Sequence, residues 1–225
     1  MMKDLVIEND LRQLLIGSLL GDGSFCSVGR HTKNKCLSIA HSIEQRAYLE
    51  YKWNILNKYN LVPRIRETKI VNPRYTHELV ECRVKTRLHP IFTEIRNSCY
   101  DCNGKKRVVI DFVKDIDALG LAIWYMDDGY VTKNSCILST CSFTLEEQTL
   151  LSTLLLKKFH LHFNVGKNDN SMYLQARDFP KFVDLIKEFV VPSMQYKLVP
   201  YSKRVLHKSG ELLGHPLIED NQQPS

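Results

Sequence analysis

Two apolar segments of the sequence each end in an aspartate followed by a glycine. They read LIGSLLGDG, from Leu15 to Gly23, and LAIWYMDDG, from Leu121 to Gly129. The aspartates Asp22 and Asp128 are 106 positions apart in a chain of 225 residues. A single DDG would be interpreted as a solvated turn, because Asp and Gly are common turn residues and a helix C-terminus disfavours an acid. Two such endings at half-chain spacing instead indicate a repeated element whose acids have a function.

If both segments are helices that pack together, their C-terminal ends place Asp22 and Asp128 at one edge of the protein. Gly17 and Gly21 lie four residues apart in the first segment, and their missing side chains would let a second helix approach closely. Two carboxylates held there would repel each other unless a divalent cation neutralised them. An incomplete shell of oxygen ligands suits Mg²⁺, which keeps several waters and phosphate oxygens. Beside a cationic surface, the pattern predicts metal-assisted hydrolysis of a phosphodiester bond.

The sequence after each Asp-Gly pair repeats one order of elements, which is two strands, a helix, two strands and a helix. With the apolar segments, this order predicts an α+β fold of two αββαββα halves related by a pseudo-twofold axis. Each half would contain a four-stranded antiparallel sheet with helices on one face. We expect the halves at residues 1–112 and 113–200, followed by a C-terminal tail at 201–225. The helix expected at 43–59 has a broad apolar stripe, made of Ala47, Leu49, Trp53, Ile55, Leu56 and Tyr59.

A local excess of basic residues lies between Arg64 and Arg107, where eleven Lys or Arg stand against five Asp or Glu. This excess of six equals the net charge of the whole chain, which is +6. In LVECRVKTR, strand alternation places Cys82 and Val84 on one face and Arg83 and Lys85 on the other. A two-stranded ribbon fits the DNA major groove, so a sheet with one basic face favours a nucleic acid partner over a solvated charged surface. The candidate DNA-binding residues are Arg64, Arg66, Arg83, Lys85 and Arg87 in the first half and Lys133, Lys167, Asn168, Tyr173, Gln175 and Arg177 in the second.

Composition excludes several other classes of protein. No apolar run is long enough to span a bilayer, so we expect no membrane partner. The N-terminal sequence has acids among its apolar residues, which argues against a signal or transit peptide. Seven cysteines, an odd number, are typical of a reducing compartment, and Cys99 and Cys102 lack two further ligands at zinc-site spacing. An organelle matrix (mitochondrion or chloroplast) and a prokaryotic or phage-host cytoplasm both fit these features.

On its two motifs the chain resembles the LAGLIDADG homing endonucleases, in particular the monomers that contain two motifs. The first motif is close to the family pattern, whereas the second has Ile123 where a small helix-packing residue is expected and the bulky Trp124 and Tyr125 beside it. The resemblance extends through the repeated elements from about Leu11 to Leu198. It implies a monomer with internal pseudo-twofold symmetry, whose two sheets form a DNA-binding saddle.

The resemblance also implies the metal site. Asp22 and Asp128 would bind Mg²⁺ or Mn²⁺, with two or three ions shared between two active sites. The backbone carbonyls of Gly21 and Asp127 would add ligands, and the side chain of Asp127 would only face solvent.

Further catalytic roles are implied for two lysines. Lys106 and Lys197 would stabilise the transition state electrostatically or polarise the attacking water. Lys105 is the alternative to Lys106, and an exposed loop lysine is the alternative interpretation of all three.

A polar residue that orients a water is implied between the second strand and the middle helix. In the first half it falls at Ser42 or His41, and Ser42 serves equally well as the N-cap of the next helix. In the second half it falls at Ser142 or Asn168.

We therefore expect a site-specific homing endonuclease that makes a metal-dependent break in both strands of a long DNA target. It would serve intron or intein mobility, and the lack of splicing-domain sequence around it favours an intron-encoded protein. The first alternative is an RNA-binding maturase that assists splicing of a group I intron, with intron RNA as its partner. The second is a transcription regulator on the same scaffold, which would have lost its acids. Intact acids in both motifs favour the nuclease.

Overall fold

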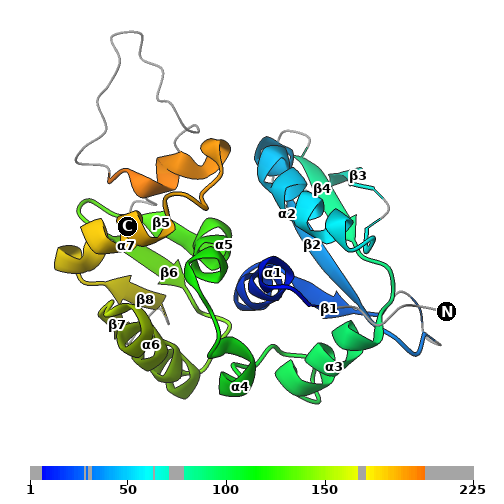
Figure 1. The fold of residues 1–225 in the computed structure, drawn as a ribbon, viewed down its shortest axis with the longest axis horizontal. Helices are drawn as coiled ribbons and strands as arrows, with labels where there is room; N and C mark the ends of the chain where they lie inside the picture. Colours follow the sequence, from blue (N-terminus) through cyan, green and yellow to red (C-terminus); the bar gives the residue numbers. More distant parts are fainter. Residues whose placement is uncertain are drawn as a thin grey trace, which may run out of the picture.

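The computed structural model describes residues 7–200 except positions 28, 30–31, 63, 71–78 and 167–170. The first half contains one four-stranded antiparallel sheet with the strand order β1-β2-β4-β3 (Figure 1). Its elements are α1 (Asn9–Leu20), β1 (Ser24–Cys26), β2 (Cys36–Ser42), a 3₁₀ turn η1 (Ile43–Gln45), α2 (Arg46–Lys58), β3 (Arg66–Ile70), β4 (Leu79–Lys85) and α3 (Pro90–Cys99).

The second half repeats this arrangement, and its sheet has the equivalent strand order β5-β6-β8-β7. Its elements are α5 (Ala118–Asp128), β5 (Gly129–Val131), β6 (Cys136–Ser139), α6 (Leu145–Phe159), β7 (Phe163–Val165), β8 (Ser171–Leu174), η2 (Ala176–Asp178), α7 (Phe179–Ile186) and η3 (Pro192–Leu198). The predicted α+β fold of two αββαββα halves is therefore confirmed. The predicted boundary after residue 112 falls inside a short connecting helix, α4 (Ile110–Val113), and the tail at 201–225 lies outside the described residues.

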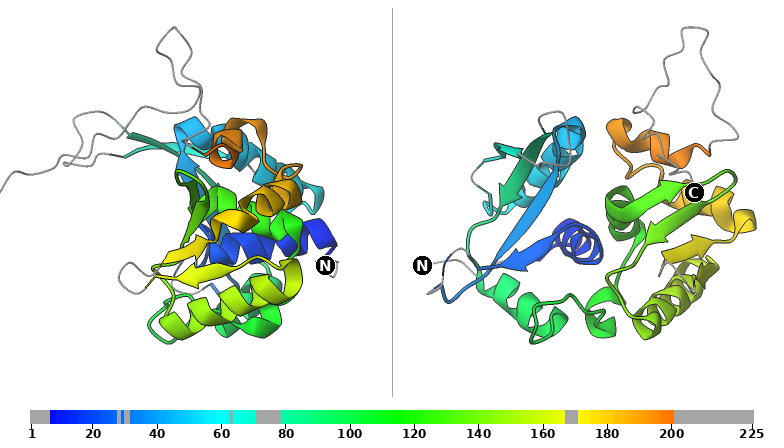
Figure 2. Two further views of the ribbon diagram at one scale, coloured as in Figure 1. Left: turned by 90° about the vertical axis from the view of Figure 1, so that its left-hand side faces the viewer. Right: turned by 180° about the vertical axis from the view of Figure 1, so that it is seen from behind.

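The two halves meet through α1 and α5, which lie side by side at the centre of the molecule (Figures 1 and 2). Gly17 makes this close approach possible, because a Cβ on it would lie 2.7 Å from both the Gly120 carbonyl oxygen and the Ile123 Cβ. Ile123, a bulky residue at a position where the family pattern has a small one, therefore packs against the glycine of the opposite helix. Trp124 and Tyr125 are fully buried. The departure in the second motif is thus accommodated by packing and leaves the helix pair intact.

Local sequence explains where the central helices begin and end. α5 begins after Asp117, whose carboxylate accepts hydrogen bonds from the backbone N–H groups of Leu119 (2.9 Å) and Gly120 (3.1 Å). Such a cap satisfies donors that have no partner inside the helix. At the other end, α1 stops at Leu20, and the N–H of Gly23 then donates to the carbonyl of Ser18 at 2.8 Å. Gly21 and Asp22 lie between the helix end and this bond, so Asp22 is placed beyond the last turn of the helix.

The buried face of α2 differs from the predicted apolar stripe. Ala47 is exposed, and Trp53 and Tyr59 are only half-buried. The helix instead buries a face that contains two polar side chains, Tyr48 and Lys52, each 0% exposed. Leu49, Ile55 and Leu56 are buried as the stripe predicts, but the prediction was wrong for Ala47 and did not include Tyr48 and Lys52. Among the described residues, no helix has the length and apolar character that crossing a bilayer requires.

Candidate active site

The acids of the two motifs converge where α1 and α5 end. Asp22 follows α1, and Asp128 is the last residue of α5. Burial raises the pKa of Asp128, the negative charges of Asp22 and then Asp127 act in the same direction, and together they bring it to about 7. Burial and the charge of Asp127 likewise raise the pKa of Asp22. The structure thus brings together one carboxylate from each half, and each is held where its charge is disfavoured.

These carboxylates fit a divalent cation. Partly desolvated acids with raised pKa values gain stability when a cation compensates their charge, and carboxylate oxygens are the ligands that Mg²⁺ and Mn²⁺ prefer. The carbonyl oxygen of Gly21, which lies next to Asp22, accepts a hydrogen bond from the Lys106 ammonium. The site therefore offers oxygen ligands for a metal ion at the ends of both helices, together with nearby cationic side chains.

Lys106 and Lys197 occupy comparable places on the two halves. Lys106 bonds to the Gly21 carbonyl after α1, and the Lys197 Nζ donates to the Met126 carbonyl oxygen in the last turn of α5 at 2.6 Å. Burial lowers the pKa of Lys106, and it lowers the pKa of Lys197 to about 8. Lys105, the alternative to Lys106, is exposed in the preceding loop. Both selected lysines therefore lie at helix C-termini, where a cation is favoured.

Tyr125 explains how Lys197 is positioned. The hydroxyl of this buried tyrosine donates to the backbone carbonyl of Lys197 at 2.6 Å. The Tyr125 ring also packs edge-on against Phe182, with a centroid separation of 4.9 Å. The aromatic residue that departs from the motif pattern thus ties η3, and the lysine on it, to α5.

The side chain of Asp127 was predicted to face solvent, and this prediction is wrong. The Asp127 carboxylate is 0% exposed and reaches into the first half, where its Oδ1 accepts from Lys52 Nζ at 2.5 Å and from the Tyr48 hydroxyl at 2.7 Å. Its Oδ2 accepts the backbone N–H of Asp22 at 3.1 Å. Burial raises the pKa of Asp127, but the Lys52 ammonium and its hydrogen bond outweigh burial, so the net shift is downward. Asp127 is therefore an ionised partner of Lys52.

His41, one of the two candidates at the end of β2, contacts this cluster. Its Nδ1 lies 3.5 Å from Asp22 Oδ2, and its Nε2 lies 3.3 Å from Lys52 Nζ. Burial and the Lys52 charge lower the pKa of His41 to about 4, which keeps the imidazole neutral at physiological pH. Ligand atoms of Asp22, His41 and Asp127 lie within 4.8 Å of one another, but the Lys52 ammonium already balances the Asp127 carboxylate.

Ser42 lies on the opposite face of β2 from His41. Its side chain is exposed, and although it precedes η1 it makes no side-chain cap hydrogen bond. The alternative role as a side-chain N-cap is therefore not observed. In the second half, strand register makes Thr140 the counterpart of His41, whereas Ser142 is exposed in the following turn. Asn168 lies outside the described residues.

The alternation predicted for β4 is observed. Cys82, Val84 and Thr86 are buried, whereas Arg83 and Lys85 point outward. Arg66 of β3 pairs with Arg83 across the sheet, so these cations share one surface. Arg64 and Arg87 are exposed just outside the strands, Lys133 lies between β5 and β6, Tyr173 lies in β8, Gln175 follows it, and Arg177 lies in η2. Lys167 lies outside the described residues.

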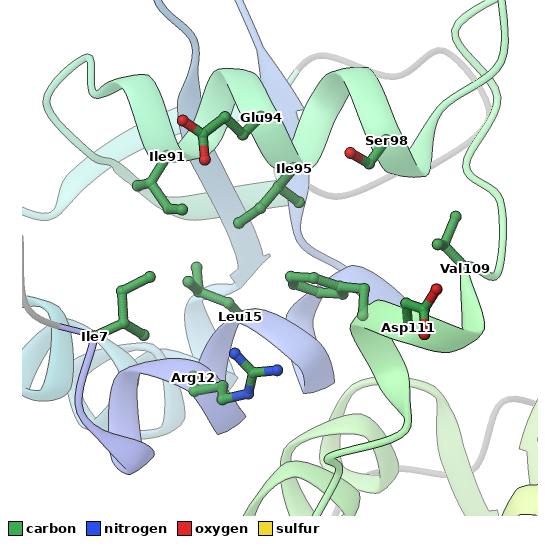
Figure 3. Close-up of a pocket in the computed structure, with 10 residues that line it drawn as sticks. Ile7, Arg12, Leu15, Ile91, Glu94, Ile95, Ser98, Val109 and Asp111 are labelled. Atoms are coloured by element: carbon green, nitrogen blue, oxygen red, sulfur yellow. The ribbon is translucent and has the colours of Figure 1, made fainter.

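A separate cavity of about 310 Å³ lies between α1, α3 and the connecting segment (Figure 3). Leu15 from α1 and Ile95 from α3 line it, together with Phe112. Arg12, at its rim, forms an ion pair with Asp115. Because the cavity adjoins the N-terminal part of α1, it is remote from the acids that follow the other end of the helix.

The fold and site define a two-half protein that carries one acid and one lysine per half at a shared helix interface. The model of the LAGLIDADG DNA endonuclease family matches residues 12–182. The chain belongs to this family, which confirms the resemblance, and it is a DNA endonuclease of the homing type.

Several proteins with known descriptions are similar over most of the chain. A cytochrome b mRNA maturase bI2 from Debaryomyces hansenii is 28% identical over 203 residues, which is 87% of this chain and 76% of the relative. A probable intron-encoded endonuclease 1 from Wickerhamomyces canadensis is 29% identical and covers 83% of each chain. The solved homing endonuclease I-WcaI, bound to its DNA recognition sequence, has a TM-score of 0.75 and 26% identity, and it covers 87% of this chain and 88% of that one.

Two polar residues of the site were missed by sequence reasoning. Tyr48 and Lys52 both lie on α2 and contact Asp127. A signal for Lys52 was present, because it stands three residues after Leu49 and three before Ile55 on the buried face of the helix.

Proposed function

We propose that this chain acts as a monomer and cuts both strands of one long double-stranded DNA site, which serves the mobility of the intron that encodes it. The observation that supports this most directly is the convergence of Asp22 and Asp128, one from each half, at a single helix interface. Two related halves supply two sets of catalytic groups, as cleavage of two strands requires. The similarity to I-WcaI, described as bound to its DNA recognition sequence, supports DNA as the target.

Asp22 and Asp128 would hold Mg²⁺ or Mn²⁺, and two or three ions would be shared between the active sites. The backbone carbonyls of Gly21 and Asp127 are the further ligands we assign. When bound, such ions supply an activated water and stabilise the oxygen that leaves the phosphorus. Asp22 and Asp128 contribute charge and fixed positions, since each continues from a helix end packed against the other half.

Lys106 and Lys197 would stabilise the developing negative charge of the scissile phosphates. Both are cationic groups held on carbonyls beside the acids, and preorganised charges of this kind need little rearrangement during the reaction. The neutral His41 imidazole, 3.5 Å from Asp22, is better placed than Ser42 to orient a water in the first half.

The outward face of the first sheet would lie along the DNA major groove. Arg66, Arg83 and Lys85 share that face, and a twisted antiparallel ribbon fits the groove. Intron RNA is the second candidate partner, and the 28% identity to a protein described as an mRNA maturase is the observation that favours it.

The test uses purified protein and supercoiled plasmid that carries the intron-less insertion site. We expect Mg²⁺-dependent linear product from the wild type and none from Asp22→Asn or Asp128→Asn. Asp111→Asn removes an exposed acid that is paired with Lys114 and serves as the matched control. An uncut plasmid together with tight, specific binding of the intron RNA would reject the nuclease in favour of the maturase.

A further inference from the structure

A fully buried ion pair links the two halves directly beside the acids. Lys52 comes from α2 of the first half and Asp127 from α5 of the second, and both side chains are 0% exposed. The Asp127 carboxylate also accepts the backbone N–H of Asp22 at 3.1 Å and the Tyr48 hydroxyl at 2.7 Å. One carboxylate therefore connects a buried cation of the first half to the main chain of a proposed metal ligand.

The pair has no charged counterpart on the other side of the pseudo-twofold axis. Strand register relates His41 to Thr140, an offset of 99 positions. The same offset relates Lys52 to Leu151, which is 1% exposed at the matching place on α6. The motif position of Asp127 corresponds to Gly21 in the first motif. A lysine and an aspartate on one side thus replace a leucine and a glycine on the other.

Gly21 is complementary to this arrangement. A Cβ on Gly21 would lie 2.5 Å from both the Cβ and the Oδ2 of Asp127, so the aspartate side chain fills the space that the glycine leaves. The Asp127 carboxylate could not reach the Asp22 N–H past a larger residue. The ion pair and Gly21 therefore form one structural unit, and its hydrogen bond goes to the main chain of Asp22 and not to that of Asp128.

We propose that Lys52 and Asp127 are positioning residues for the acid of the first half. The Lys52 ammonium holds the Asp127 carboxylate across the interface, and that carboxylate fixes the main chain of Asp22 so that its side chain faces Asp128. Asp128 has no equivalent support, because Gly21 has no side chain to provide it. This inference rests on the proposed function in that Asp22 is taken as a metal ligand.

The test distinguishes the loss of the oxygen that accepts the Asp22 N–H from the loss of the Lys52–Asp127 ion pair. Removing one partner of a buried pair leaves the other charge uncompensated and destabilises the fold, whereas replacing both is often tolerated. We therefore compare two double variants, Lys52→Met/Asp127→Asn and Lys52→Met/Asp127→Leu. Both lack the ion pair, but only the asparagine retains an oxygen that can accept the Asp22 N–H.

We expect the leucine variant to need roughly tenfold more Mg²⁺ for half-maximal cleavage than the asparagine variant. A tenfold change corresponds to about 1.4 kcal/mol, which is the size of one lost hydrogen bond. Titration of Mn²⁺ into the metal-free proteins should show the same order of affinity without any cleavage. Thermal unfolding in EDTA should place the two double variants close together, which excludes a difference in folding.

Gln13→Leu is the control for a general effect of the interface. Gln13 is a buried polar contact between the same two helices at their other end, where its Oε1 accepts from Asp117 N at 2.8 Å and its Nε2 donates to the Asp115 carbonyl at 3.0 Å. We expect this variant to lower the unfolding temperature without changing the Mg²⁺ or Mn²⁺ dependence.

Equal metal dependence of the two double variants would overturn the proposal, and so would an equal shift in Gln13→Leu. If the wild type cut no DNA, the proposed function would fail, but the order of Mn²⁺ affinities would still decide whether the pair positions Asp22.

Discussion

Replacing Asp128 by asparagine should abolish cleavage and at the same time stabilise the metal-free protein. Burial and the charges of Asp22 and Asp127 raise the pKa of Asp128 from 3.8 to about 7. A carboxyl whose pKa is raised on folding binds its proton more tightly in the folded state than in the unfolded state. Its ionisation therefore opposes folding, and stability is lost as the pH rises between the two values.

The magnitude follows from the shift. Raising the pKa of Asp128 from 3.8 to about 7 corresponds to roughly 4 kcal/mol of destabilisation above pH 7. Asp128 is half-buried, so solvent screens part of this energy, and we expect a gain of about 2 kcal/mol for Asp128→Asn at pH 8. For a chain of this length that corresponds to an increase of roughly 4–8 °C in Tm.

Thermal unfolding in EDTA at several pH values measures this effect. The Tm difference between Asp128→Asn and the wild type should be small at about pH 4, grow up to about pH 7 and then level off. Mg²⁺ should raise the Tm of the wild type and narrow the gap, because a bound ligand stabilises only the protein that binds it. Asp111→Asn, which removes an exposed acid whose pKa is lowered by Lys114, should give no gain. An Asp128→Asn protein that is no more stable than the wild type at pH 8 would refute the electrostatic account of the site.

Three further predictions concern the helix interface, the sheet and the coupling between ligands. Gly17→Ala should lower stability by about 1–3 kcal/mol and reduce cleavage, because the new Cβ would lie 2.7 Å from the Ile123 Cβ; an increase in Tm, as the better helix propensity alone would give, contradicts the close packing. Arg83→Ala and Lys85→Ala should each reduce the salt dependence of DNA binding by about one unit of slope, measured by fluorescence anisotropy between low and high salt, and unchanged slopes would remove these residues from the interface. Ca²⁺ should tighten DNA binding, and target DNA should tighten Ca²⁺ binding by the same factor, which paired titrations can check.

The fold could be predicted from the sequence because it is a repeat. Two similar motifs, each followed by the same elements, require equivalent halves, and equivalent halves that pack through their first helices bring Asp22 and Asp128 together. The family resemblance then pointed to Lys106 and Lys197, which contact carbonyls at the ends of those helices.

The contacts of Asp127 could not be predicted in this way, since they break the symmetry of the repeat. Lys52 and Asp127 are 75 positions apart, and their motif and helix counterparts, Gly21 and Leu151, give no hint of an ion pair. The choice between His41 and Ser42 could have been made from the sequence. Alternation from Leu37 along β2 places His41 on the buried face and Ser42 on the outer one, and this alone would have chosen between the two candidates.

The charges of the site explain why a cation and DNA phosphates should bind together. The described residues that converge there include three carboxylates, from Asp22, Asp127 and Asp128, and three ammonium groups, from Lys52, Lys106 and Lys197. When all six are ionised their charges cancel, so each divalent cation that binds adds two uncompensated positive charges to a partly desolvated site. Each phosphodiester carries one negative charge, so the two scissile phosphates offset part of the charge that the cations bring. A cation bound without DNA, or DNA bound without a cation, leaves charge uncompensated where burial makes it costly. The balance of three carboxylates and three ammonium groups therefore weakens metal binding by the free protein and favours joint binding of cations and target DNA.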